Sequence, residues 1–357
     1  MVKVRIKDNR VKSAHHLLNQ AENMVSRGDY LAAINLLQSS GEYNNREIAQ
    51  RLIELRIEAY SHLNWPKPST SWPPAHDDRF EAIAGIPEVP FSELDVPNLK
   101  AGIIGKGALI VRGMMSDGLI AEMRGMIDCV LRARMEANDE KANNENPWYY
   151  RSERVKGGPA QLRVLRGDER YTTVGSAWSV DSPPVAFRII EFFHDIGLPN
   201  LLNAYFDEKP VLSVRKWVVR CAPPNNGAQA GWHQDGRFLG DPKSIRTVNL
   251  WIALSDCGPQ ADAPGLEIIS GTGDKIFDTG TQGAEFDWTV SPEIVKEIAR
   301  TNPVQCPNFS AGDAIFFDHF NLHRTGFGQN HTLNRYAIES WFFAGSAAPL
   351  KQQPVVF

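Results

Sequence analysis

From residue 211 onward, apolar residues recur with a period of two, and this pattern restricts the possible folds more than any other feature of the chain. Short apolar runs, among them VLSVRKWVVR, LEIISG and RYAIESWFF, are separated by clusters of Gly, Pro, Asn and Asp. Alternation of this kind is typical of short strands joined by turns. Many short strands in succession predict a sandwich or barrel of the jelly-roll kind.

Residues 11–62 show a different period, with apolar residues three and four positions apart, which predicts three helices separated by turns. The stretch AENMVSRGDYLAAINLLQ resembles a tetratricopeptide-type helical hairpin. A single repeat cannot bury its own apolar face. These helices therefore either cap the rest of the chain or dock a partner protein, and the sequence leaves both interpretations open.

The stretch NWPKPSTSWPP, at residues 64–74, contains four prolines and indicates a linker. We therefore expect a helical module at residues 1–63, a Pro-rich linker and lead-in at 64–99, and a main domain at 100–357. The expected fold class is mostly β with flanking helices, with a double-stranded β-helix (jelly-roll or cupin-like) core at about 205–345. A further helix is expected at roughly 184–205.

Composition excludes several classes of protein. The formal net charge of −4 gives no electrostatic reason to expect a nucleic-acid partner. No apolar stretch approaches the roughly 18–20 residues that span a bilayer, and the first part of the chain lacks the apolar core of a signal peptide. The four cysteines are scattered without paired spacing. We therefore expect a cytoplasmic protein without a membrane span.

The segment GWHQDGRF contains His233 and Asp235, two residues apart. Residues i and i+2 of an extended strand project to the same face, so both side chains could bind one metal ion. A His-x-Asp triplet alone carries little weight in a chain with nine histidines, and a metal site needs at least one more ligand. His319, His323 and His331 all follow a predicted buried strand and are candidates for it.

In its C-terminal half the chain resembles the phytanoyl-CoA dioxygenase-like group of iron(II)- and 2-oxoglutarate-dependent oxygenases. The resemblance rests on motifs in a fixed order: the His-x-Asp triplet, VNLWIALSDCGPQADAPGLEIISGTG, AGDAIFFDHFNLHRTG and RYAIESWF. Upstream, LKAGIIGKGALIVRGMMS is similar to the weaker N-terminal signature of the family. The resemblance covers roughly residues 100–345 and implies a jelly-roll oxygenase.

The resemblance implies a ligand set of His233, Asp235 and His323. In the family the distal histidine precedes the arginine that binds 2-oxoglutarate by about ten to twelve residues, and His323 precedes Arg335 by twelve, whereas His319 precedes it by sixteen. Two imidazoles and one carboxylate on one face of Fe(II) leave adjacent positions for 2-oxoglutarate and O2. The family pattern assigns the far carboxylate of 2-oxoglutarate to Arg335, assisted by Thr325. A guanidinium suits this role because it forms two parallel hydrogen bonds with a carboxylate.

The implied reaction is hydroxylation of an unactivated C–H bond of a small-molecule or carrier-bound substrate, with release of succinate and CO2. Related halogenases replace the carboxylate ligand by a small residue, and this chain keeps Asp235. Two alternatives are a non-catalytic jelly-roll scaffold that docks a partner through its N-terminal helices, and a cupin-like metal enzyme that does not use 2-oxoglutarate. Arg163, Arg166 and Arg237 are candidates for substrate binding.

Overall fold

The computed structural model describes residues 2–42, 45–67, 70–137, 146–149, 175–224, 231–326 and 331–357. Its α-helices are α1 (Val2–Val25), α2 (Tyr30–Ser39), α3 (Arg46–His62), α4 (Val96–Lys100), α5 (Asp117–Ala137), α7 (Pro183–Asp195), α8 (Leu198–Phe206) and α9 (Pro292–Ile298). Its strands are β1 (Glu88–Pro90), β2 (Ala108–Arg112), β3 (Ser176–Trp178), β4 (Pro210–Ala222), β5 (His233–Gln234), β6 (Thr247–Ala253), β7 (Gly265–Ile269), β8 (Ala314–Phe317), β9 (Leu322–Gly326), β10 (Arg335–Ala344) and β11 (Pro354–Val355).

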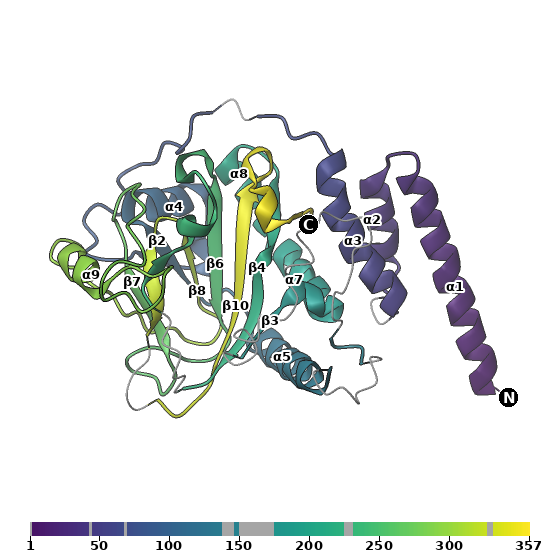
Figure 1. The fold of residues 1–357 in the computed structure, drawn as a ribbon. Coiled ribbons are helices and arrows are strands. Elements are labelled where there is room, and N and C mark those ends of the chain that lie inside the picture. The colour runs from purple at the N-terminus through teal and green to yellow at the C-terminus, as the bar shows by residue number, and fades with distance from the viewer. Residues whose placement is uncertain are drawn as a thin grey trace.

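The strands form two sheets that face each other (Figure 1). In the described part of the chain, the large sheet has the order β1-β2-β8-β6-β10-β4-β11, with β3 paired to β4. The small sheet has the order β5-β9-β7. Side chains of both sheets, including Trp251, Leu266, Ile268 and Ile315, share one buried cluster between the layers. The period of two from residue 211 onward therefore corresponds to real strands, as predicted.

Helices cover the other face of the large sheet. Val248, Leu250 and Ile252 of β6 belong to a core cluster that also contains apolar residues of α5, α7 and α8, and Figure 1 shows these helices beside the sheet. The intervening residues of β6, among them Asn249 and Trp251, point toward the small sheet, since successive strand residues point to opposite faces. The large sheet is buried on both faces, and only its inner face can contribute to a site between the sheets.

The expectation of a mostly β chain is too strong. Helices contribute more residues than strands in the described part of the chain, because a layer of amphipathic helices is needed to bury the outer face of the large sheet. The single helix expected at roughly 184–205 is also wrong in detail. It is divided into α7 and α8 at Gly197, which has a φ of 72°, and Pro199 lies in the first turn of α8.

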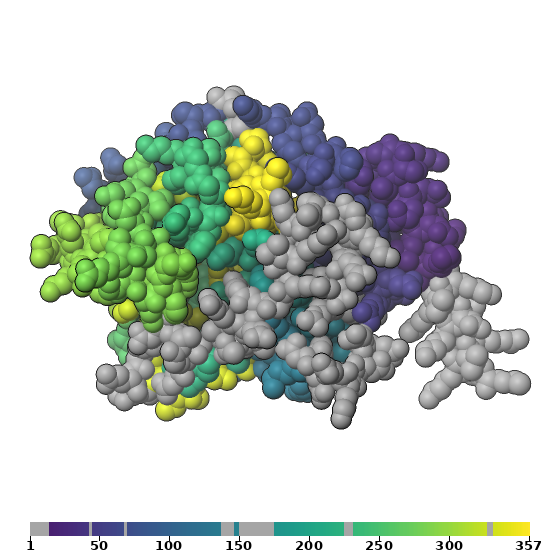
Figure 2. Space-filling view, in the orientation of Figure 1, coloured from purple at the N-terminus to yellow at the C-terminus, as the bar shows by residue number. Residues whose placement is uncertain are grey.

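The N-terminal helices pack against the rest of the protein, as the purple and blue atoms at one end of the molecule show in Figure 2. Helix α3 contacts α7 and β11, while α1 packs on α2 and α3. Arg56 donates a hydrogen bond to the carbonyl of Val356 (2.7 Å), and the Tyr60 hydroxyl donates to the carbonyl of Gly345 (2.9 Å). These contacts favour the capping interpretation. Within the described residues, no helix combines the length and the apolar character needed to cross a bilayer.

Candidate metal centre

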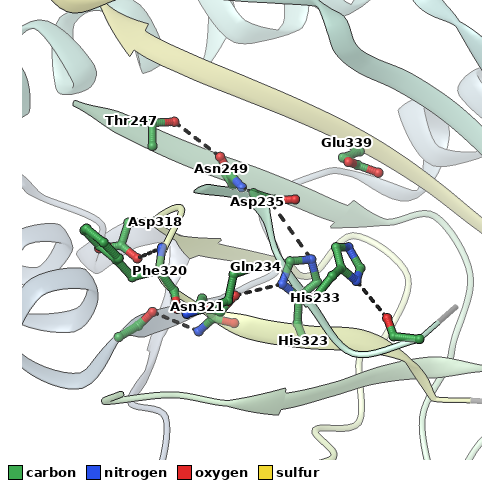
Figure 3. A network of polar contacts seen from close by, with 12 residues as sticks. His233, Gln234, Asp235, Thr247, Asn249, Asp318, Phe320, Asn321, His323 and Glu339 are labelled. Carbon is green, nitrogen blue, oxygen red and sulfur yellow. Dashed lines mark hydrogen bonds and ion pairs between the residues drawn. The ribbon is translucent and has the colours of Figure 1, made fainter. Parts of the chain in front are cut away.

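Pairing of β5 with β9 places His233 directly opposite His323 in the small sheet. Asp235 follows as the first residue of the short 3-10 helix η5 (Asp235–Phe238). One possible ligand atom from each of these three residues lies within 4.8 Å of the others, and Nε2 of His323 is 4.0 Å from Oδ2 of Asp235. Figure 3 shows the three side chains converging between the two sheets.

Backbone carbonyls orient both imidazoles. Nδ1 of His233 is 3.0 Å from the carbonyl oxygen of Gly231, and Nδ1 of His323 is 3.1 Å from that of Asn321. A carbonyl oxygen can only accept, so each Nδ1 carries the proton and each Nε2 keeps its lone pair. Carbonyl contacts of this kind fix the tautomer of metal-binding histidines. The two rings are thus preset to offer Nε2 to an ion beside Asp235.

The carboxylate of Asp235 is buried and is held by the opposite sheet. Its exposed fraction is 2%, and its Oδ2 accepts a hydrogen bond from the side-chain amide of Asn249 in β6. The amide oxygen of Asn249 in turn lies 3.3 Å from the Thr247 hydroxyl, which donates to it. The large sheet therefore sets the direction of the carboxylate, while the small sheet sets the two imidazoles.

We expect Asn249→Ala to weaken metal binding by about 10–100-fold, the usual effect of removing a group that orients a ligand. The substitution leaves Asp235 in place but removes the donor that fixes its carboxylate. Titration of the purified protein with Mn(II) measures the change. Asn203→Ala, at an exposed position of α8, is the matched control and should bind Mn(II) like the parent. Equal affinity in the Asn249 and Asn203 variants would contradict the orienting role.

Burial shifts the pKa values of His233 and Asp235 in the directions that favour their neutral forms. Burial, with a contribution from the neighbouring His323, holds the pKa of His233 well below its usual value. The imidazole is therefore neutral at neutral pH and can act as a ligand. Burial raises the pKa of Asp235, and the positive charges of nearby groups oppose this effect. A divalent cation would stabilise the ionised carboxylate in the same way.

Gly236 lets the chain turn immediately after Asp235. Its N–H donates to the carbonyl of His319 (2.9 Å). A Cβ at this position would lie 2.6 Å from Cδ1 of Ile276 and 2.9 Å from Cδ2 of His319. No larger residue fits without displacing the segment that carries the candidate ligands.

We therefore expect Gly236→Ala to lower the free energy of unfolding by about 1–3 kcal/mol, the scale for overpacking a buried site. Urea denaturation measures this change. Gly118→Ala is the control: Gly118 lies in α5 with no atom within 4 Å of its would-be Cβ, so alanine there should be neutral or stabilising. A Gly236 variant as stable as the parent would show that the turn tolerates a side chain.

Arg335 lies at the start of β10 and is 2% exposed. Its Nη1 donates to the carbonyl of Gly265 (3.0 Å), and its guanidinium lies over the ring of Trp251, 5.5 Å from the centroid. No carboxylate among the described residues forms an ion pair with it, and its Nε has no hydrogen-bond partner there. Burial lowers the pKa of Arg335 to about 10, which leaves the side chain charged at neutral pH.

Thr325 lies two residues after His323 in β9, and so on the same face of the small sheet. Its partner across the ladder is Leu266. The carbonyl of the preceding residue, Gly265, accepts a hydrogen bond from Arg335. The geometry thus brings Arg335 and Thr325 to the same end of the space between the sheets.

Sequence reasoning missed three charged residues that lie near the cluster. Arg220 of β4 donates from Nε and Nη2 to Oε2 of Glu339 in β10 (3.0 and 2.7 Å), and Nζ of Lys216 lies 4.5 Å from the centroid of the Trp341 ring. Burial alone would raise the pKa of Glu339, but Arg220 and Lys216 lower it to about 2. Glu339 could have been found, because it lies four residues after Arg335 and thus on the same face of β10.

The other candidate residues lie elsewhere. Nε2 of His319 is 2.9 Å from the carbonyl of Pro242, and neither His319 nor His331 belongs to the cluster of possible ligands found in the described residues. Arg237 is exposed and donates to the Thr279 hydroxyl (2.9 Å). Arg163 and Arg166 lie outside the described residues, as does most of the irregular segment that contains them.

Two imidazoles and one buried carboxylate on one side of a space between facing sheets are the ligand set of a non-haem iron oxygenase. A model of the family described as Phytanoyl-CoA dioxygenase (PhyH) matches residues 105–335, more than half of the chain. The chain therefore belongs to the phytanoyl-CoA dioxygenase family, and the resemblance noted in the sequence is confirmed. It is a 2-oxoglutarate-dependent dioxygenase in class, with iron and 2-oxoglutarate as cofactors and O2 as the oxidant.

Solved structures with similar folds include EctD from S. alaskensis with 2-oxoglutarate and 5-hydroxyectoine, at 15% identity and a TM-score of 0.48, covering 68% of this chain and 73% of EctD. AviO1 from Streptomyces viridochromogenes is 21% identical, with a TM-score of 0.40 and coverage of 66% and 89%. The epimerase SnoN from nogalamycin biosynthesis is 16% identical, with a TM-score of 0.39 and coverage of 67% and 78%. No curated protein matches the chain in sequence.

Proposed function

We propose that His233, Asp235 and His323 bind Fe(II), and that the protein hydroxylates an unactivated C–H bond of a small-molecule or carrier-bound substrate. Three observations support the ligand assignment: the close approach of the three side chains, the free Nε2 atoms of both imidazoles, and the burial of Asp235. Once bound, iron with 2-oxoglutarate and O2 supplies the oxidising power, while the protein orients the substrate and excludes water.

The observation that carries the proposal is the buried guanidinium of Arg335, which has no carboxylate partner among the described residues. An unpaired buried charge is costly. The far carboxylate of 2-oxoglutarate would neutralise it, and Thr325 at the same end of the site would supply a hydroxyl donor. A cupin-like enzyme that does not use 2-oxoglutarate would leave this arginine without a function.

Hydroxylation is the proposed outcome because the carboxylate ligand is retained. Asp235 lies where a halogenase has a small residue, so the position that a halide would need is filled. Arg220, Lys216 and Glu339 line the same inner face and bring two positive charges and one negative charge close to Asp235. These residues would contact the part of a substrate that approaches the iron.

The two facing sheets support a jelly-roll core at about residues 205–345. The division into a helical module at 1–63, a lead-in at 64–99 and a catalytic domain at 100–357 stays a prediction, as does a cytoplasmic location. Docking of a partner protein by α1–α3 is the less favoured interpretation, because α3 already packs on α7 and β11.

Succinate release provides the test. The protein is incubated with Fe(II), 2-oxoglutarate and a panel of amino acids, acyl thioesters, phosphonates and natural-product intermediates, and succinate is measured by mass spectrometry. The product mass identifies the reaction: hydroxylation adds one oxygen atom, desaturation removes a pair of hydrogens, and epimerisation leaves the mass unchanged. Coupled turnover that yields only a product of unchanged mass would replace hydroxylation by epimerisation.

A further inference from the structure

A second cavity, with a volume of about 360 Å³, lies behind the segment that links β8 to β9. Its walls come from the π-helix η2 (Ala101–Gly105), α8, Trp72 and the loops at 271–274 and 318–321. In Figure 3, Asp318 and Phe320 of this cavity are separated from His233 by Gln234 and Asn321. The cavity is therefore distinct from the space in which the candidate metal ligands meet.

Aromatic and aliphatic side chains form most of the wall. Trp72 and Tyr205 meet edge to face with ring centroids 5.8 Å apart, and Phe320, Ile103 and Ile104 complete the apolar lining. Tyr205 is buried, with an exposed fraction of 1%. Aromatic faces of this kind attract organic cations, and the attraction is stronger where water is excluded.

Two polar side chains of the wall, His319 and Asn321, keep a buried acceptor atom without a partner in the described structure. Nε2 of His319 faces the carbonyl of Pro242 and so carries the proton, which leaves Nδ1 as an acceptor. Asn321 donates from Nδ2 to the carbonyl of Gly107 (3.1 Å), which leaves its Oδ1 as an acceptor. Both residues are at most 3% exposed, and neither of these acceptor atoms has a hydrogen-bond partner in the described structure.

Asp318 adds a carboxyl group to these acceptors. Its Oδ1 accepts the N–H of Phe320 (2.9 Å), and no basic side chain of the described residues forms an ion pair with it. Lys243 contributes to the exposed rim of the cavity without reaching ion-pair distance. Burial raises the pKa of Asp318 to about 7, as expected for a carboxyl group that lacks a positive partner. The cavity thus combines an unpaired acid, unpaired acceptors and aromatic walls.

We propose that this cavity binds a small organic ammonium ion. The ammonium N–H groups donate to the carboxylate of Asp318, and the apolar part of the ligand packs against Trp72 and Phe320, which are both partly exposed in the cavity wall. Such a ligand gives the carboxylate of Asp318 a positive partner inside the cavity, whereas Lys243, the cation among the described lining residues, lies at the exposed rim.

The cavity shares its wall with the segment that carries the candidate metal ligands. The carbonyl of His319 accepts the N–H of Gly236, and the carbonyl of Phe320 accepts from Nε2 of Gln234 (2.6 Å). Gly236 and Gln234 flank Asp235 in the sequence. A ligand in the cavity would therefore contact the segment that hydrogen bonds to the residues on both sides of Asp235.

Calorimetric titration of the full-length protein with benzylammonium chloride tests the proposal, with benzyl alcohol as the neutral probe of matched shape. We expect saturable binding of benzylammonium and at least tenfold weaker binding of benzyl alcohol. Asp318→Asn should weaken benzylammonium binding at least tenfold. Asp278→Asn, which removes an exposed charge from the loop between β7 and α9 at a position that does not line the cavity, should leave binding unchanged. The measurement needs neither iron nor turnover, so its result is independent of the proposed oxygenase activity.

A second variant keeps the test decisive if Asp318→Asn does not fold. Ile104→Trp leaves the carboxyl group intact and fills part of the cavity with a larger side chain, and it should also abolish binding. Three results would overturn the proposal: no saturable binding of benzylammonium to the parent, equal binding of benzyl alcohol, or unchanged binding in the variants of Asp318 and Ile104 that fold.

Discussion

Alanine in place of Asp235 is expected to reduce 2-oxoglutarate-dependent succinate release to the background rate. Asp235 supplies the only carboxylate of the three-residue cluster, and it is 2% exposed. Removing it leaves the two imidazoles without a negatively charged co-ligand, and leaves the amide of Asn249 without its acceptor. Succinate is measured by mass spectrometry with Fe(II) present, and Mn(II) titration measures the loss of the metal separately.

Asp278→Ala is the control for this experiment, because Asp278 is an exposed residue of the loop between β7 and α9. It should release succinate at the rate of the parent. Thermal unfolding of both variants without metal shows whether either has lost its fold. If Asp235→Ala folds and still releases succinate, Asp235 is not a ligand, and the assignment of the metal centre is wrong.

Arg335→Ala is expected to weaken 2-oxoglutarate binding by about 2–5 kcal/mol, the scale for removing one partner of a buried charge pair. Each 1.4 kcal/mol corresponds to about tenfold in the dissociation constant. The reason is geometric as well as electrostatic, since the carbonyl of Gly265 and the ring of Trp251 fix the guanidinium. Titration of the Mn(II)-loaded protein with 2-oxoglutarate in the absence of O2 measures the loss.

Arg335→Lys separates charge from geometry. Lysine keeps the positive charge but cannot form the planar pair of hydrogen bonds. The affinity of the lysine variant for 2-oxoglutarate should therefore lie between those of the parent and the alanine variant. Mn(II) affinity should be unchanged in both variants, because Arg335 is not part of the ligand cluster. Unaltered 2-oxoglutarate affinity in the alanine variant would move the anchor to another residue.

The strand pattern predicted the part of the fold that carries the site. The runs around Val218, Leu250 and Ile338 are strands, because alternating apolar residues bury one face of a sheet wherever the period is two. Gly197 followed closely by Pro199 indicates a break between α7 and α8. The break was not predicted, because the apolar residues on both sides of it have a helical period. The proportion of helix was underestimated because a strand pattern does not show which elements cover the outer face of the large sheet.

The residues of the ligand cluster could be named from the sequence because they occur in short motifs with fixed order. Asn249 and Arg220 could not, since each lies in a strand whose partner residues are distant in the sequence. A charged residue in a strand usually faces solvent, and only the pairing of β4 with β10 shows that Arg220 and Glu339 share the inner face. Arg237 follows the candidate metal-binding segment directly, but its side chain is exposed at the 3-10 helix η5.

Gln234 lies between the two candidate ligands and points to the other face of β5. Its amide donates to the carbonyls of Lys275 and Phe320, and its oxygen accepts the N–H of Phe277 (2.8 Å). If β5 shifted by one residue along β9, the side chains of His233 and Asp235 would both turn outward, since adjacent strand residues point in opposite directions. These three bonds tie β5 to the loop at 275–277 and to Phe320, just before β9, and they involve no ionisable side chain. The position of β5 is thus held by an uncharged amide, whose hydrogen bonds do not depend on the charge of the candidate ligands on either side of it.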